Sequence, residues 1–254
     1  MLDTDINLHT FIKEIELAKQ VQKNLLPKKP PNVPGLDIWV ATRFAYQIGG
    51  DFYDFIWDSG QTLNFVMADI CGKGVSGALL MPMTRMVIRN VASREFGLSP
   101  EEIISQSNKY LYDDFNNTDT FATAFIGNFN PRTSIFVYAN AGLSPVIYYP
   151  FGGVAQYLQA DGTPIGIFEI SESINHYIHL KPGDILLIGT DGIVDNYRRQ
   201  GDLYEAYLRL LKETERLVNK SAQKIVESLF TKSNMDKRSN VLNDDQTLMV
   251  IKCT

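Results

Sequence analysis

Short apolar runs, separated at close intervals by Gly, Pro and Asp, dominate the chain and restrict its fold class. The runs LDIWVAT (36–42), FYDFIWD (52–58) and TLNFVMADI (62–70) have the length and the Val, Ile and aromatic content of β-strands. The sequence DSGQ (58–61) between the second and third runs is typical of a hairpin turn. Similar runs return from Thr120 to the last residues, as in a sandwich or a layered antiparallel sheet.

Helical patterns interrupt these runs in two groups. The expected helices cover residues 75–96, 99–115, 203–218 and 221–232. In the second of them Ser99 can cap the helix, Pro100 suits the first turn, and Glu102 completes a capping box. Because helices and antiparallel strands are grouped in sequence, we expect an α+β fold with helices packed on the outer faces of the sheets.

A separate amphipathic helix is expected ahead of the first strand. Residues 6–26 carry apolar side chains at helical spacing, and PKKPPNVPG (27–35) then has four prolines in nine residues, which excludes helix and suits a linker. We therefore expect an N-terminal linker or regulatory helix at 1–27 and one main domain at 28–254. The apolar stripe of the helix must be buried on that domain or on a second copy of the chain.

Bulk composition excludes several classes of protein. With a net charge of -5 and no dense Lys/Arg stripe, the chain does not resemble a nucleic-acid binder that works by phosphate neutralisation. Its two cysteines, Cys71 and Cys253, are too few for a disulfide framework. The acidic start lacks the features of a signal peptide, and no apolar run approaches the roughly 20 residues that span a bilayer. These features predict a cytoplasmic protein with no membrane insertion and no nucleic-acid partner.

Aspartates collect where the strand-like runs begin or end. Asp51 follows two glycines, Asp69 closes NFVMAD, Asp191 follows LLIGT, and Asp244 with Asp245 precedes QTLMV. Strand ends converge at one rim of a sheet, so these carboxylates can meet although they lie far apart in the sequence. Taken singly, such an Asp is more often a turn residue than a ligand. Taken together, the five favour a shared site that would repel itself without cations.

Hard divalent cations match such a cluster. Mg²⁺ and Mn²⁺ prefer carboxylate, carbonyl and water oxygens, so neither His nor a thiolate is required. Two ions about 3.5–4 Å apart can clamp a phosphate and turn bound water into a nucleophile near neutral pH.

Several linked motifs resemble those of the SpoIIE/RsbU-type bacterial serine phosphatases, which belong to the PPM superfamily of type 2C protein phosphatases. The motifs, in chain order, are VQKNLLPKKPP, GGDFYDF, ADICGKGVSGALLM, YANAGLSP, GTPIGI, LKPGDILLIGTDGI and DDQTLMV. The resemblance covers the chain from about residue 17 to its C-terminus. It implies a β-sandwich of two antiparallel sheets flanked by helices on both faces, with a centre of two Mn²⁺ or Mg²⁺ ions at one end.

The resemblance also assigns roles to the aspartates. Asp69 would bridge the two ions, and Asp51 with the backbone carbonyl of Ile70 would hold one of them. Asp191 and Asp244 would hold the other ion. Asp245 would orient waters or bind a weaker third ion. The implied reaction is hydrolysis of a phosphoserine or phosphothreonine ester by metal-activated water, without a phosphoenzyme.

Other positions carry weaker signals. Lys73, flanked by glycines, is placed to bind the substrate phosphate, although a solvated loop lysine is an equally good interpretation. Leu143 stands where the family often has His after NAG, which removes a possible proton donor. Asp54 is expected on the opposite face from Asp51. Cys71 lacks a nearby His and is interpreted as a small buried thiol.

The resemblance implies that the substrate is a phosphorylated anti-sigma-factor antagonist of STAS type and that a regulatory input arrives through the helix at 6–26. As a separate hypothesis, this helix pairs with its twin across a homodimer and shifts the helix that begins near Val75. Two alternatives stay open. The GGD motif suggests a cyclase, but GGDFYDF does not continue as such motifs do. Leu143 suggests a pseudophosphatase that binds phosphoproteins without hydrolysing them.

Overall fold

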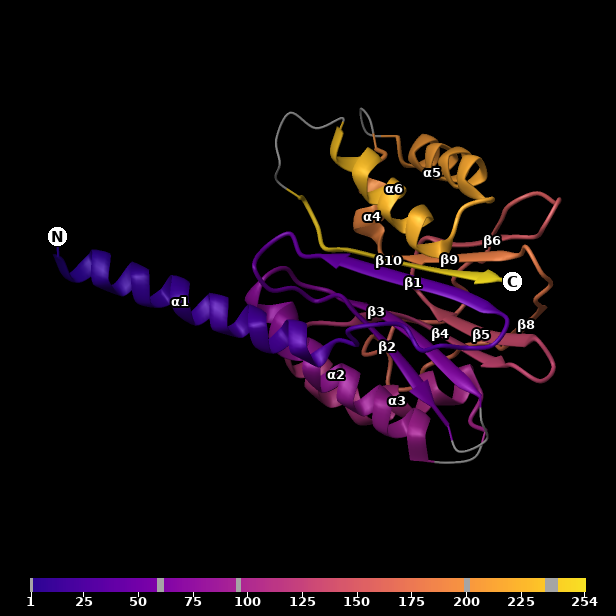
Figure 1. The fold of residues 1–254 in the computed structure, drawn as a ribbon. Coiled ribbons are helices and arrows are strands. Elements are labelled where there is room, and N and C mark those ends of the chain that lie inside the picture. The colour runs from indigo at the N-terminus through magenta and orange to yellow at the C-terminus, as the bar shows by residue number, and fades with distance from the viewer. Residues whose placement is uncertain (1, 59–61, 95–96, 199–201, 236–241) are drawn as a thin grey trace.

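The computed structural model describes residues 2–58, 62–94, 97–198, 202–235 and 242–254, which fold into two packed antiparallel sheets with helices outside both (Figure 1). The strands are β1 (Leu36–Arg43), β2 (Phe52–Trp57), β3 (Leu63–Ile70), β4 (Ala122–Asn130), β5 (Ile135–Ala141), β6 (Val146–Tyr149), β7 (Gln156–Tyr157), β8 (His176–His179), β9 (Ile185–Gly189) and β10 (Gln246–Cys253). The helices are α1 (Leu2–Leu25), α2 (Val75–Arg94), α3 (Pro100–Asn117), α4 (Asp191–Asp195), α5 (Leu203–Leu217) and α6 (Ala222–Met235).

Each sheet has five strands, in the order β1-β10-β9-β6-β7 for the first and β2-β3-β4-β5-β8 for the second. The expected α+β sandwich is therefore confirmed. The predicted pairing of β2 with β3 is also confirmed, with Phe52 opposite Ala68. Residues 59–61 of the predicted turn lie outside the described residues.

Strand β10 shows why the first sheet is apolar on both faces. Met249 and Ile251 face the core between the sheets, whereas Leu248 and Val250 face the layer of α4, α5 and α6. All four side chains are buried, and each contributes roughly 1.5–3 kcal/mol relative to an exposed position. A strand covered on both sides loses its polar alternation, so QTLMVIKC reads as a continuous apolar run.

Helices α2 and α3 cover the outer face of the second sheet (Figure 1). The predicted capping box of α3 is confirmed, because the Ser99 side chain accepts from the Glu102 N–H and the Glu102 side chain accepts from the Ser99 N–H. Pro82 lies inside α2, and the helix continues past it. Short helix α4, directly after β9, was not expected from the sequence.

Helix α1 projects from the sandwich (Figure 1). Along its described side chains Leu8, Phe11, Ile12, Leu17 and Val21 are between 55% and 62% exposed, so much of its apolar surface has no cover within the described residues. The division of the chain at residue 27 stays a prediction.

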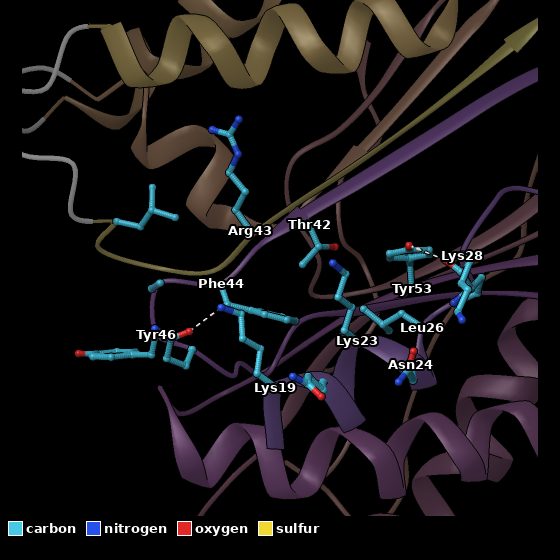
Figure 2. A pocket seen from close by; sticks show the side chains of 15 residues that line it. Lys19, Lys23, Asn24, Leu26, Lys28, Thr42, Arg43, Phe44, Tyr46 and Tyr53 are labelled. Carbon is cyan, nitrogen blue, oxygen red and sulfur yellow. Dashed lines mark hydrogen bonds between the residues drawn. The ribbon is translucent and has the colours of Figure 1, made fainter. Parts of the chain in front are cut away.

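The proline-rich segment after α1 is attached to the sandwich. The Tyr53 hydroxyl of β2 donates to the carbonyl of Pro27 at 2.8 Å (Figure 2), and Val33 bridges to Leu36. Among the described residues, no helix has the length and apolar character needed to cross a membrane.

Candidate metal centre

The antiparallel pairing brings the segments with the predicted ligands to one end of the sandwich. In the second sheet, the segment before β2, with Asp51, lies beside the end of β3, with Asp69. In the first sheet, the end of β9, followed by Asp191, lies beside the start of β10, preceded by Asp244 and Asp245. Strand ends far apart in sequence therefore meet, as the sequence predicted.

Asp51 joins the two sheets from a buried position. Its side chain is 1% exposed, and its Oδ2 accepts hydrogen bonds from the hydroxyls of Thr190 at 2.8 Å and Thr247 at 2.7 Å. The backbone N–H of Thr247 donates in turn to the Thr190 hydroxyl at 2.9 Å. This network orients the carboxylate and leaves its Oδ1 buried without a hydrogen-bond partner in the described structure.

The electrostatic surroundings of Asp51 disfavour its charge. Burial, and then the nearby carboxylates of Asp69 and Asp245, raise the pKa of Asp51 well above its usual range, against the two threonine hydrogen bonds. An unpaired buried carboxylate oxygen is costly, and a cation beside it would remove the cost.

Asp69 lies next to Asp51 at the end of β3. Burial, and then the charges of Asp191, Asp244 and Asp245, raise the pKa of Asp69 to about 7, although the interaction of its side chain with Asp51 opposes the shift. Asp69 therefore interacts with carboxylates from both sheets, which is the position that a bridging ligand requires.

The carbonyl of Ile70 lies beside the backbone before Asp51. A Cβ at Gly50 would stand 2.8 Å from the Ile70 oxygen, and one at Gly49 would overlap the Asp245 carboxylate. Only glycine allows this approach, so Gly49 and Gly50 let the backbone pass close to the Ile70 carbonyl and the Asp245 carboxylate.

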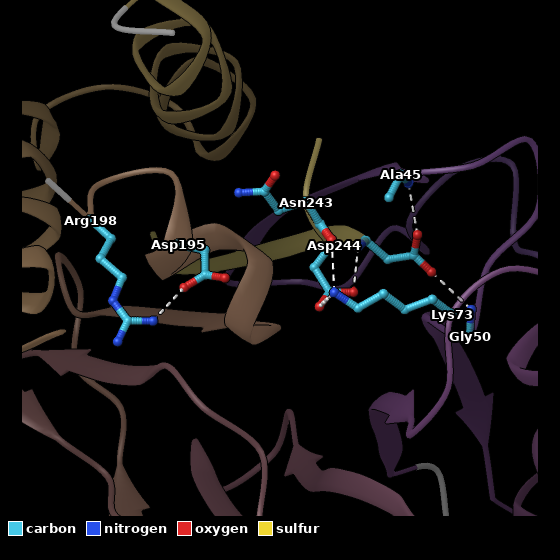
Figure 3. Close-up of polar contacts among 8 residues, drawn as sticks. Ala45, Gly50, Lys73, Asp195, Arg198, Asn243 and Asp244 are labelled. Carbon is cyan, nitrogen blue, oxygen red and sulfur yellow. Dashed lines mark hydrogen bonds and ion pairs between the residues drawn. The ribbon is translucent and has the colours of Figure 1, made fainter. Parts of the chain in front are cut away.

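Asp191 and Asp244 lie nearer to solvent than Asp51. Figure 3 shows the Lys73 side chain extended toward Asp244. The Lys73 ammonium is 2.7 Å from Asp244 Oδ2 and donates to the Asn243 carbonyl at 2.8 Å. Partial burial and the charges of Asp244 and Asp195 raise the pKa of Asp191. Lys73 thus contacts a predicted ligand; its predicted role in binding the substrate phosphate stays a prediction.

Asp245 holds the loop before Asp51. Its two carboxylate oxygens accept hydrogen bonds from the backbone N–H groups of Ala45 and Gly50, both at 2.8 Å (Figure 3). Burial raises the pKa of Asp245, and these backbone hydrogen bonds oppose the shift. The bonds suit a residue that positions the Asp51 segment.

The donor set fits hard divalent cations. It consists of carboxylates and one carbonyl, and the orphaned Asp51 Oδ1 is a buried oxygen that lacks a partner among the described residues. In the described part of the chain, however, no three or more His, Cys, Asp or Glu side chains are arranged so that they could already hold an ion. Mutual repulsion of the carboxylates opposes such an arrangement, so closure around an ion would require small side-chain movements.

The raised carboxyl pKa values predict how stability depends on pH without metal. A carboxyl whose pKa is higher in the folded state binds protons more tightly there, so stability falls as pH rises from the unfolded value near 3.8 to about 7. With EDTA present, the melting temperature is expected to fall over this range. Because cations neutralise these carboxylates, Mn²⁺ should raise the melting temperature more at about pH 8 than at about pH 5.

Differential scanning fluorimetry on the parent and on Asp69→Asn checks this prediction, because the difference between them isolates one carboxyl from all other titrating groups. A melting temperature that does not fall, or a fall identical in the variant, would contradict it.

Asp54 does not belong to the candidate metal centre but to a separate group of ion pairs. It is 1% exposed on the side of β2 that faces α2, where its carboxylate pairs with Arg85 and Arg89, each at 2.8 Å. The expectation that it faces away from Asp51 agrees with this placement. These ion pairs attach α2 to β2. Helix α2 begins directly after the loop that carries Lys73.

Two other sequence interpretations can be compared with the structure. Leu143 is 1% exposed and belongs to the core between the sheets, where Asn140 bonds its backbone. Cys71 is exposed, so its interpretation as a buried thiol was wrong: it follows the last residue of β3, outside the packed layers. Partial desolvation by neighbouring atoms and the charges of Asp69 and Asp244 raise the pKa of Cys71, which disfavours a nucleophilic thiolate.

The sequence interpretation missed the residues that position the ligands. Thr190 and Thr247 hold Asp51, and Gln22 of α1 binds the backbone of Gly49. The threonines flank predicted ligands at strand ends, a signal that was present in the sequence. Gln22 lies within the polar positions of an amphipathic helix and gave no comparable signal.

Comparison with known proteins identifies the family of this chain. The family described as Stage II sporulation protein E (SpoIIE) matches residues 59–254. The phosphoserine phosphatase RsbU of Bacillus subtilis (strain 168) is 31% identical over 240 residues, which cover 94% of this chain and 70% of RsbU. The chain spans only 32% and 45% of the lengths of two further curated relatives.

Solved structures show the same fold at low sequence identity. The SiaA-PP2C domain of Pseudomonas aeruginosa is similar with a TM-score of 0.84 and 18% identity, over 98% of this chain and 99% of that one. RsbX, solved in complex with magnesium, is similar with a TM-score of 0.64 and 19% identity, over 88% of this chain and 98% of that one. The sandwich is therefore of the PP2C type.

Proposed function

Because this chain belongs to the SpoIIE family of PP2C-type phosphatases, we propose that it is a metal-dependent protein serine/threonine phosphatase. Its substrate would be a phosphoserine or phosphothreonine on a partner protein. The observation that carries the proposal is the meeting of Asp51, Asp69, Asp191 and Asp244 from four strand ends at one end of the sandwich.

We assign the ligands residue by residue. Asp69 would contact both ions, since it interacts with Asp51 of its own sheet and with Asp191, Asp244 and Asp245 from the strand ends of the other sheet. Asp51 and the Ile70 carbonyl would hold one ion, and Asp191 and Asp244 the other. Two ions, Mn²⁺ or Mg²⁺, would supply a water nucleophile and neutralise the phosphoryl oxygens. RsbX, a structural relative, was solved with magnesium, which supports a divalent cation here.

The remaining residues would position these ligands. Thr190 and Thr247 direct Asp51, and Asp245 fixes the loop at Ala45 and Gly50. We assign Asp245 to this positioning role first and to a weaker third ion second. Lys73 is paired with Asp244 in this structure. Once a cation takes the place of the Lys73 ammonium beside Asp244, Lys73 would be close enough to the predicted ligands to bind the substrate phosphate.

We further propose that the partner is a STAS-type anti-sigma-factor antagonist, on the basis of the likeness to RsbU. The alternative of a pseudophosphatase depended on Leu143. That side chain is buried in the core, and all the predicted aspartates are present, so the structure offers this alternative no specific support.

Manganese-dependent hydrolysis of p-nitrophenyl phosphate tests the proposed function. We expect turnover with Mn²⁺ that disappears with EDTA and returns when Mn²⁺ is added back. Absence of turnover with Mn²⁺ and with Mg²⁺, in protein that melts cooperatively, would contradict it.

Helix α1 provides a route for regulation. The Gln22 side chain is 4% exposed and bonds both backbone groups of Gly49: its Nε2 donates to the carbonyl at 2.7 Å, and its Oε1 accepts from the N–H at 3.1 Å. Gly49 lies two residues before Asp51. A movement of α1 would therefore act on the ligand segment, and we propose that α1 pairs with its twin in a homodimer through its exposed apolar side chains.

Deletion of residues 1–26 is expected to abolish the dimer and to change turnover. The deletion removes the exposed apolar surface and leaves the Gly49 N–H and carbonyl without Gln22, which costs about 1–3 kcal/mol locally. Light scattering measures the mass, and p-nitrophenyl phosphate measures turnover. Unchanged mass and unchanged turnover would contradict the proposal.

Two point variants separate the two effects. Gln22→Ala should change turnover without changing the mass, whereas Phe11→Glu should change the mass. Glu14→Ala, at an exposed position on the same helix, is the matched control and should change neither.

A further inference from the structure

A pocket of about 1170 Å³ lies between the C-terminal end of α1 and the segment that leads from β1 toward the metal centre (Figure 2). Lys19, Lys23 and Lys28 line its α1 side. Arg43, Phe44 and Tyr46 come from the opposite side. We call it the basic pocket.

Its charge is unusual for this protein. The residues that line the basic pocket include four cations, Lys19, Lys23, Lys28 and Arg43, and no Asp or Glu. The whole chain has 29 acidic and 24 basic residues, so its average surface is negative. A local excess of positive charge on an acidic protein attracts anionic partners selectively.

Two of the four cations are available to a ligand. Lys23 and Lys28 are exposed, and neither has an acidic partner within the described part of the chain. Lys19 donates to Gln47 at 2.6 Å and stands 3.9 Å from Glu16, and the Arg43 guanidinium lies 4.8 Å above the Phe230 ring. These last two cations help to shape the walls.

Residues in the walls of the basic pocket are connected to the candidate centre by hydrogen bonds. Ala45 lines the pocket and donates its N–H to Asp245, which also bonds Gly50, the residue before Asp51. On the other wall, α1 contacts Gly49 through Gln22. A ligand in the pocket would therefore lie next to the segment that carries a predicted metal ligand.

We propose that the basic pocket binds an acidic segment of the phosphoprotein substrate, adjacent in sequence to the phosphorylated residue. This inference rests on the proposed phosphatase function. The volume exceeds that of one small anion, and exposed lysines on long side chains suit carboxylates spread along a peptide. Exposed Tyr46 and the ring of Phe44 offer apolar contact for the same segment. The pocket would then select among phosphoproteins, while the aspartates carry out the reaction.

Two synthetic phosphoserine peptides of equal length test the proposal. They share the residues next to the phosphoserine and differ only in one flank, which is rich in Asp and Glu in the first and in Ser and Gly in the second. With Mn²⁺, the parent chain is expected to hydrolyse the acidic peptide with roughly 5- to 10-fold higher kcat/KM, mainly through a lower KM, because each exposed ion pair contributes modestly. High salt should reduce this preference.

The double variant Lys23→Glu with Lys28→Glu is expected to remove or invert the preference. Lys109→Glu with Lys212→Glu makes the same charge change at exposed positions of α3 and α5 and should keep it. Because the readout is a ratio between two peptides, general damage to the variant protein does not imitate the effect. Fluorescence anisotropy with the labelled acidic peptide measures binding independently of turnover.

The outcomes are distinguishable. If p-nitrophenyl phosphate and both peptides are hydrolysed but the peptides equally well, the inference is wrong and the phosphatase function stands. A preference that survives the Lys23/Lys28 double variant, or is lost equally in the Lys109/Lys212 control, also overturns the inference. If none of the three substrates is hydrolysed, the proposed function fails, and the inference fails with it.

Discussion

Replacing Asp69 by Asn is expected to lower manganese-dependent kcat/KM for p-nitrophenyl phosphate by about 10³-fold or more, which corresponds to a loss of about 4 kcal/mol in transition-state stabilisation. Asp69 interacts with Asp51, Asp191, Asp244 and Asp245, so its replacement removes the proposed shared ligand. Asp191→Asn should lose activity to a similar extent.

Asp69→Asn should lower activity but should not lower the stability of the metal-free protein. Burial and neighbouring charges raise the pKa of Asp69, so its ionised form is unfavourable in the metal-free fold. Asn removes that charge, and the metal-free variant should be at least as stable as the parent. Its rise in melting temperature on adding Mn²⁺ should be small or absent.

Asp113→Asn, on the exposed side of α3, is the matched control and should keep both the activity and the response to Mn²⁺. If Asp69→Asn retained activity within tenfold of the parent, the assignment of the metal centre would be wrong. Loss of activity with an intact response to Mn²⁺ would contradict the ligand role specifically.

Asp54→Asn is expected to reduce the free energy of unfolding by about 3–5 kcal/mol, because breaking a buried ion pair leaves an uncompensated buried charge. The Asp54 side chain is 2% exposed and the Arg85 side chain 13%, whereas Arg89 is 43% exposed. Arg85 would therefore carry most of the penalty. Urea unfolding followed by circular dichroism measures the change.

The double variant Asp54→Leu with Arg85→Met is the informative comparison. Removing both charges leaves no buried ion behind, so we expect it to be more stable than Asp54→Asn. Arg89→Met should cost less than Arg85→Met, since the Arg89 side chain is partly hydrated. Equal stabilities for Asp54→Asn and the Asp113→Asn control would show that the pair contributes nothing measurable.

The sequence predicted the fold closely because local pattern carries most of that information here. Strand runs with β-branched and aromatic residues, and the capping box at Ser99, depend on neighbours a few residues apart. The short helix α4 was missed because five residues are too few for a helical period to be recognised. The burial of Cys71 was predicted incorrectly because residue type indicates preference, while exposure depends on where a strand ends.

The candidate site was predictable to the level of its aspartates. Acids at strand ends beside glycine form a visible pattern, and the family resemblance assigned them roles. The contacts that orient them were not predictable, because Thr190 is 139 residues and Thr247 is 196 residues from Asp51. The same holds for Gln22 on Gly49 and for Asp54 with its two arginines, each at ordinary polar positions of a helix or strand.

The sequence by itself determined most of the strands and helices and the carboxylates at the strand ends, since periodicity and turn chemistry act over a few residues. Only the tertiary structure decided that threonines of one sheet hold the aspartate of the other, that Asp54 fastens α2, and that lysines of α1 face the end of β1 across a pocket. These are contacts between distant parts of the chain. They depend on how two sheets and their helices pack against each other, and local sequence pattern does not encode that packing.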